Sequence, residues 1–220
     1  PAPPLALSAQ GNIERLAEPA VAMVGARRST RRSQQWAEQA ADRLSALGLT
    51  VVSGMAFGID AAAHRGALPS GRTIAVLGSG LMRPSPRSHT ALMRAILKDG
   101  GLVVSEYPLT QEARKYSFPE RNRLVTGLAL GVVIVEAGYR SGSLISARLA
   151  LEQGREVMAV PGPVGIPGSV GCHRLLKQGA ALVENAEDIV QVLGLERLLI
   201  SPTPLGGAPA KQPSTPMRAG

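Results

Sequence analysis

The sequence predicts one α/β domain with a doubly wound, mostly parallel, Rossmann-like sheet. Short runs rich in Val, Ile and Ala alternate with longer Ala- and Leu-rich segments of helical periodicity, which is the rhythm of βα units. The short runs are apolar throughout, as expected for strands that are buried on both faces of a parallel sheet. Loops rich in Gly and Ser follow several of these runs, where doubly wound folds place their ligands.

The elements are expected in alternating order along the chain. Because they are short and β-branched or apolar, six runs are predicted as strands, at residues 20–24, 49–53, 73–77, 102–105, 132–136 and 157–160. Between them, helical periodicity predicts helices at residues 33–47, 58–68, 88–98, 119–130 and 143–153, the first of which Thr30 or Ser33 could cap. A last unit covers residues 172–193 and contains a short strand at 181–183.

Length and composition favour one folded domain with short ends. At 220 residues, with 45% hydrophobic and 18% charged residues, the chain can bury a core. We expect a connector at residues 1–11, a Rossmann-like domain at 12–195, and a Pro-rich linker or tail at 196–220. One cysteine excludes an internal disulfide, and the apolar runs are too short to span a bilayer, so a soluble, cytoplasmic protein without a membrane partner is expected.

The charge balance favours a polyanionic partner. The formal net charge is +8, and 20 of the 24 basic residues are arginine. Guanidinium groups bind phosphates in a fork and stack on flat rings. A charge that serves only solubility is the alternative.

Four small-residue loops follow predicted strands, at residues 25–30, 53–60, 78–80 and 138–143. Glycine allows close approach of a backbone to a ligand, and the helix that follows presents unpaired N–H groups. The candidate phosphate-binding residues in them are Gly25, Gly78, Ser79, Ser141, Gly142 and Ser143. No G-x-G-x-x-G or G-x-x-x-x-G-K-[ST] pattern is present, so no nucleotide cofactor is expected.

Aromatic and basic residues gather in the same loops. Phe57, Tyr116 and Tyr139 are candidates to stack on bases, whereas Tyr107 and Phe118 could pack locally. The cations near them that we select are Arg27, Arg28, Arg121, Arg123 and Arg140. Cations that neutralise phosphates beside exposed rings favour single-stranded nucleic acid.

The sequence contains few patterns that indicate catalysis. Three histidines form no zinc-binding spacing, and no G-x-S-x-G elbow is present, so we assign no catalytic residue and no metal site. Asp60 and His64 lie four residues apart on one predicted helix and could form an acid–base pair. Glu136 could polarise a nucleophile, but is expected rather to accept hydrogen bonds from loop N–H groups or arginine.

Several motifs occur together in a fixed order. They are VGAR at 24–27, VSG at 52–54, GIDAAAH at 58–64, FPERNR at 118–123, EA at 136–137, RSGSLI at 140–145, PG at 161–162 and GCHRL at 171–175. Over residues 12–193 the chain thereby resembles the DNA-processing protein A (DprA) family.

The resemblance implies an extended Rossmann domain that binds single-stranded DNA and helps to load the RecA recombinase during natural transformation, without known catalysis. It implies a homodimer formed through residues 171–183, for which His173, Lys177 and Leu182 are our candidate dimer or RecA surface. Carried over by position, the family's DNA-binding residues fall on Arg27, on Arg72 before the third predicted strand, and on Arg121, Asn122 and Arg123. Phe57 stands where relatives commonly carry Lys or Arg, and Ala26 replaces a small hydroxyl residue.

We therefore predict a sequence-tolerant site in which Arg27, Arg72, Arg121 and Arg140 engage successive phosphates, while Tyr116 or Tyr139 stacks on bases. Two alternatives stay open. One is a nucleotide phosphoribohydrolase-like enzyme, although the residues after Glu136 lack that family's glutamate until Glu152. The other is a recombinase adaptor that touches DNA only incidentally.

Overall fold

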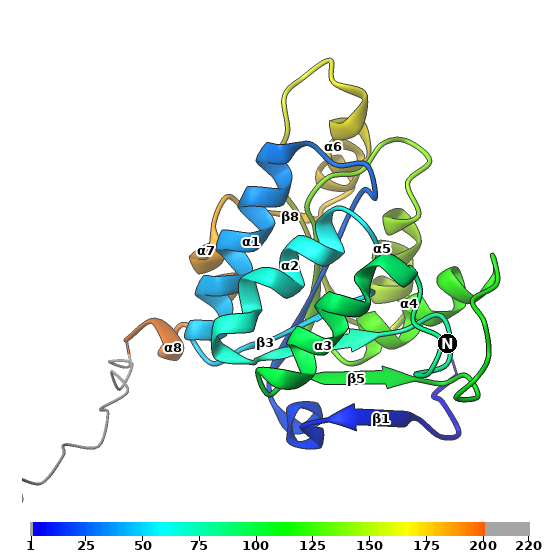
Figure 1. Cartoon of the computed structure of the whole chain (residues 1–220). Helices are drawn as coiled ribbons and strands as arrows, with labels where there is room; N and C mark the ends of the chain where they lie inside the picture. Colours follow the sequence, from blue (N-terminus) through cyan, green and yellow to red (C-terminus); the bar gives the residue numbers. More distant parts are fainter. Residues whose placement is uncertain (1, 201–220) are drawn as a thin grey trace, which may run out of the picture.

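The computed structural model describes residues 2–200, which build one sheet with helices on both faces (Figure 1). The strand order is β1-β5-β4-β3-β2-β6-β7-β8, with β1 antiparallel to β5 and all other pairs parallel. The strands are β1 Ser8–Gly11, β2 Ala20–Val24, β3 Thr50–Ser53, β4 Thr73–Val76, β5 Leu102–Ser105, β6 Gly131–Ile134, β7 Glu156–Ala159 and β8 Ala181–Leu182. The predicted doubly wound, mostly parallel sheet is confirmed.

The α-helices lie in two layers. They are α1 Arg31–Ala46, α2 Ile59–Ala67, α3 Thr90–Lys98, α4 Ser117–Gly127, α5 Ser143–Glu152, α6 Val170–Lys177, α7 Ala186–Val192 and α8 Arg197–Ile200. Helices α1, α2 and α7 pack on one face with Val21, Val51 and Val133, and α3 closes the β5 end of that face. Helices α4, α5 and α6 cover the opposite face, over Val52 and Val132. Each central strand is thus buried on both sides, as its unbroken apolar sequence requires.

The switch in strand order lies between β2 and β6. From β2 the chain moves through α1 to β3, away from β6, while β6 continues through α5 to β7 on the other side. In such a sheet the loops at the carboxyl ends of the two strands diverge and leave a crevice. Here those loops are residues 25–30 after β2 and residues 135–142 after β6.

Glu136 ties the two diverging loops together. Its carboxylate accepts a hydrogen bond from the Thr30 N–H at 3.0 Å and another from the Thr30 hydroxyl at 2.9 Å. Thr30 in turn caps α1 by accepting from the Ser33 N–H at 3.2 Å. Both the predicted cap and the expected role of Glu136 as an acceptor for loop N–H groups are confirmed.

The structure differs from the expectation at the N-terminus and agrees in part at the C-terminus. Residues 8–11 were expected in a connector but form β1 at the edge of the sheet, followed by a 3₁₀ turn at Ile13–Ala17. The expected last unit is present as α6, β8 and α7. Residues 197–200 form the short helix α8, and the rest of the expected tail, 201–220, lies outside the described residues. Within residues 2–200 we find no helix with the length and apolarity needed to cross a membrane.

Candidate nucleic-acid interface

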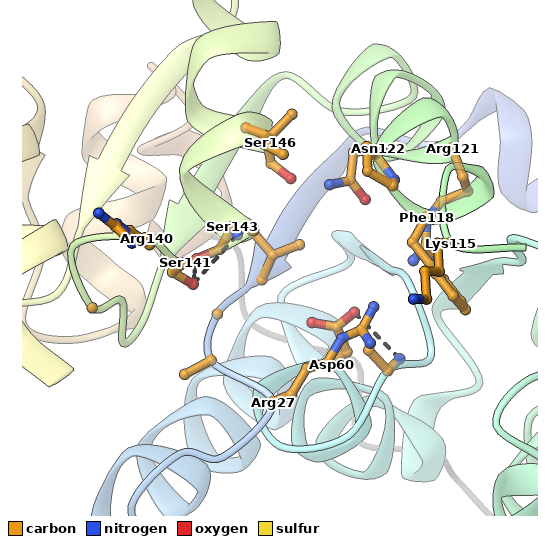
Figure 2. Close-up of a pocket in the computed structure, with 18 residues that line it drawn as sticks. Arg27, Asp60, Lys115, Phe118, Arg121, Asn122, Arg140, Ser141, Ser143 and Ser146 are labelled. Carbon is orange, nitrogen blue, oxygen red and sulfur yellow. Dashed lines mark hydrogen bonds between the residues drawn. The ribbon is translucent and has the colours of Figure 1, made fainter.

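A cleft of about 610 Å³ opens at the switch point of the sheet. Its walls come from the loop after β2, the start of α4, and the loop that leads into α5, with the start of α2 at the floor (Figure 2). The side chains that define it are Arg27, Asp60, Lys115, Phe118, Arg121, Asn122, Arg140, Ser141, Ser143 and Ser146. A cleft of this size is within the range of small-molecule and nucleotide sites.

Arg27 stands at the mouth of the cleft. Its guanidinium lies over the Phe118 ring, 4.8 Å from the ring centroid, and forms no ion pair within the described residues. The backbone before it runs close to α2, because a Cβ on Gly25 would lie 2.6 Å from Cγ1 of Ile59. Arg27 is therefore held on one side by an aromatic face while its N–H donors stay available to an anion.

The opposite wall is the serine loop, residues 140–143, at the beginning of α5. The hydroxyls of Ser141 and Ser143 are 2.7 Å apart, and Gly142 precedes the ten-residue helix without a side-chain cap. Arg140 is exposed beside them and lines the cleft. The N–H groups of Leu144 and Ile145 already donate to the carbonyls of Ser141 and Gly142. The donors that this wall offers to a phosphate oxygen are therefore the serine hydroxyls and the nearby guanidinium.

Arg121 lies beneath the cleft rather than at its mouth. Only 4% of the residue is exposed, and its Nη1 donates to the Gly54 carbonyl at 2.5 Å and to the Val76 carbonyl. Burial lowers the pKa of Arg121 to about 10, against the opposing attraction of Asp60, so the group is a cation near neutral pH. Its main role in the structure is to hold the β3 and β4 ends together beneath the cleft.

Asp60 is buried on the floor and braces the loop after β3. Its Oδ2 accepts hydrogen bonds from the Gly54 N–H at 3.2 Å and the Ala56 N–H at 3.3 Å. Burial raises the pKa of Asp60, while Arg121 acts in the opposite direction. Because the two groups carry opposite charges, each lowers the free-energy cost of burying the other.

The structure gives Asp60 and His64 different partners. His64 Nδ1 lies 2.7 Å from the Thr73 hydroxyl, which donates to the Val51 carbonyl. Burial lowers the pKa of His64 to about 3, so the imidazole is neutral near neutral pH. The pair considered from the sequence is therefore not formed, because each side chain serves the packing of its own strand or loop. Within residues 2–200, no three His, Cys, Asp or Glu side chains are grouped so that they could hold a metal ion.

Eight of the residues selected from the sequence line this cleft. They are Gly25, Arg27, Arg121, Asn122, Arg140, Ser141, Gly142 and Ser143. Gly78 and Ser79 are buried behind it: a Cβ on Gly78 would lie 3.1 Å from the Phe118 ring, so the glycine leaves room for that wall.

Other selected residues lie in the neighbouring loops without lining the cleft. Arg28 is exposed in the loop after β2. Phe57 is 48% exposed and stacks edge-on against His89. Tyr116 and Tyr139 are also exposed, each with an arginine over its ring, at 5.9 Å for Arg114 and 5.7 Å for Arg174.

Two predicted cations are not brought to the cleft. Arg72 directly precedes β4, so it lies at the amino edge of the sheet, opposite the cleft, and pairs with Glu18 at 2.7 Å. Arg123 pairs with Glu106 at 2.5 Å and does not line the cleft. The structure therefore does not bring the predicted row of Arg27, Arg72, Arg121 and Arg140 together at the cleft mouth, since Arg72 lies at the opposite edge and Arg121 is buried.

The candidate dimer residues lie on the last unit of the fold. His173 and Lys177 are on α6, where His173 Nε2 is 2.8 Å from the Gly162 carbonyl, and Leu182 is on the edge strand β8 and 52% exposed.

The site selection missed Lys115, Asp60, Phe118 and Ser146, which line the cleft. Ser146 could have been found, because it lies one turn after Ser143 on the same helix. Lys115 stands next to Tyr116 in a basic and aromatic segment, which is also a visible signal.

The fold and this cleft define a class: a doubly wound α/β protein with a cleft lined by basic residues at the switch point of its sheet. The chain belongs to the DNA recombination-mediator protein A family, whose model matches residues 1–194. The resemblance found from the motifs is thereby confirmed.

Relatives and solved structures agree with this membership. The chain is 48% identical to protein Smf of Escherichia coli over 191 residues, which are 86% of this chain and 51% of the relative. The structure of DNA processing protein A from Streptococcus pneumoniae matches with a TM-score of 0.79 and 41% identity, over 84% of this chain and 65% of that one. The Helicobacter pylori protein, whose structure addresses its single-stranded DNA binding, matches with a TM-score of 0.81 and 34% identity, over 87% and 88% of the two chains. The chain spans about half the length of the curated E. coli relative.

Proposed function

We propose that this chain binds single-stranded DNA without sequence preference, through the cleft at the switch point. The observation that carries the proposal is the set of donors around one aromatic wall. They are Arg27 and Arg140, which form no ion pair with any residue from 2 to 200, Lys115, and the serine loop at the start of α5. Such a site contacts phosphates and a base face, neither of which depends on sequence. The H. pylori relative's single-stranded DNA binding supports the same ligand class.

We further propose that the bound strand is handed to a RecA recombinase in the cytoplasm, during recombination and natural transformation, and that the chain acts as a homodimer without catalysis. Family membership as a recombination mediator supports the first part. For the dimer, the support is the exposed Leu182 on the edge strand β8, next to α6 with His173 and Lys177. For the absence of catalysis, the support is that the buried groups Asp60, His64 and Glu136 are each engaged in holding the fold.

The first prediction concerns salt. If Arg27, Lys115 and Arg140 each neutralise one phosphate, log affinity for a single strand should fall against log salt concentration with a slope of about −2. The measurement is a fluorescence-anisotropy titration with a labelled oligomer over a series of salt concentrations, and a matched duplex should bind more weakly throughout. A slope near zero would exclude the phosphate contacts, and no binding at all would leave only the adaptor role.

A further inference from the structure

The floor of the cleft differs chemically from its mouth. Of the described side chains that line it, four are cations and Asp60 is the single carboxylate. Two backbone N–H groups and the nearby Arg121 favour the charged form of Asp60 against the effect of burial. A phosphate placed against this carboxylate would meet a like charge, whereas a neutral group that presents an N–H would be attracted, because an ionised carboxylate only accepts hydrogen bonds. The cleft therefore combines a basic mouth with an acceptor at the floor.

Asp60 uses only one of its oxygens within the protein. Both of its hydrogen bonds, from the N–H groups of Gly54 and Ala56, go to Oδ2. Within residues 2–200, Oδ1 accepts no hydrogen bond, and neither Arg27 nor Arg121 forms an ion pair with the carboxylate. The residue is 6% exposed and lines the cleft, where Figure 2 shows it at the floor near Arg27. A nearly buried acceptor of this kind is stabilised by a donor from a ligand.

An unpaired nucleobase offers such a donor beside the aromatic wall. Each of the bases carries an N–H on its Watson–Crick edge, an imino group in thymine and guanine and an amino group in adenine and cytosine. Proteins that take a base out of a stack read this edge by hydrogen bonds while they hold the ring against apolar side chains. In the cleft, the Phe118 ring and the Arg27 guanidinium that lies over it form the surface for the base, and Arg140 and the serine loop are placed for a neighbouring phosphate.

We propose that Asp60 accepts a hydrogen bond from the Watson–Crick N–H of one unpaired base, and that this contact makes the site selective for single strands. The inference rests on the proposed function of the same cleft. In a duplex this N–H already donates to the pairing base, so it cannot also donate a hydrogen bond to Oδ1 of Asp60. Because all bases carry a donor on that edge, the contact keeps the site tolerant of sequence.

The test uses two oligomers that differ in this donor alone. Thymine has a single N–H, at N3, so a thymidine oligomer is compared with the same oligomer made of N3-methylthymidine. The wild-type chain should bind the methylated strand about tenfold or more weakly, as for the loss of a hydrogen bond to a charged group. Equal affinities, with the thymidine oligomer bound, would overturn the inference and leave the proposed function intact. If the thymidine oligomer itself is not bound, the proposed function fails first.

The variant D60N separates the hydrogen bond from the bulk of the added methyl group. In D60N the amide oxygen should keep the N–H groups of Gly54 and Ala56, so the NH2 donor replaces Oδ1 toward the base. The two oligomers should then bind equally, whereas a persisting difference would show that the methyl group acts by its size and would overturn the inference. Folding of D60N is checked by circular dichroism. If it does not fold, the wild-type chain is titrated with an oligomer of 2,4-difluorotoluene nucleotides, which keep the shape of thymine without the N–H. Affinity equal to that for thymidine then contradicts the role of Asp60.

Discussion

Replacing Arg27 by glutamate should weaken binding of single-stranded DNA by about tenfold or more at moderate salt, for every base composition. The guanidinium is exposed at the mouth of the cleft, is positioned by the Phe118 ring, and has no ion-pair partner among the described residues. Reversing its charge removes one charge-assisted contact and places a repulsive group beside the remaining phosphate path. The measurement is an anisotropy titration of R27E, in which the salt slope should also become shallower by about 0.7.

The matched control is R72E. Arg72 has the same charge, but it lies at the amino edge of the sheet and pairs with Glu18. Its reversal should leave affinity for single strands within about twofold of the wild type once folding is confirmed, because exposed charges more than a Debye length from a ligand are largely screened. If R72E weakened binding as much as R27E, the strand would have to reach the opposite edge, and the cleft could not be the main site.

Replacing Arg121 by methionine should destabilise the fold by about 3–5 kcal/mol, because two buried hydrogen bonds from a charged donor are removed. The change leaves Asp60 without its buried countercharge and leaves the carbonyls of Gly54 and Val76 without their donor. Urea denaturation followed by circular dichroism measures the loss as a lower midpoint at an unchanged slope.

Arg123 provides the comparison on the same helix. It pairs with Glu106, but its side chain is 21% exposed, so R123M should cost only about 1 kcal/mol. Equal losses in R121M and R123M would contradict the bracing role of Arg121. A stable R121M that binds DNA poorly would instead return Arg121 to the set of direct phosphate contacts.

The sequence predicts a residue's position correctly where that position depends only on the strand, helix or loop that contains the residue. The central strands could be predicted because they are buried on both faces and therefore uniformly apolar. The serine loop and Arg27 could be predicted because loops after parallel strands share one edge of the sheet. Strand β1 was missed because Ser8–Gly11 is a short edge strand without β-branched residues, and its pairing with β5 depends on a segment far along the chain.

The same reasoning failed where a residue's environment is built by distant segments. Arg121 looks like any surface arginine in a basic run, yet its partners are carbonyls 67 and 45 residues away. Its burial follows from the packing of α4 over the ends of β3 and β4, which composition does not reveal. Arg72 was assigned to the site because it matches the position of a basic residue in the family. However, a residue that directly precedes a parallel strand lies at the amino edge of the sheet, whereas ligands bind at the carboxyl edge.

Photochemical crosslinking tests most directly where the strand lies. A single-stranded oligomer that carries 5-iodouracil is irradiated with the wild-type chain, and the crosslinked peptides are identified by mass spectrometry. The cleft predicts crosslinks in residues 115–122 and 138–146, centred on Phe118, with competition by unlabelled single strands. Crosslinks that concentrate instead around Glu18 and Arg72, at the amino edge of the sheet, would contradict the account.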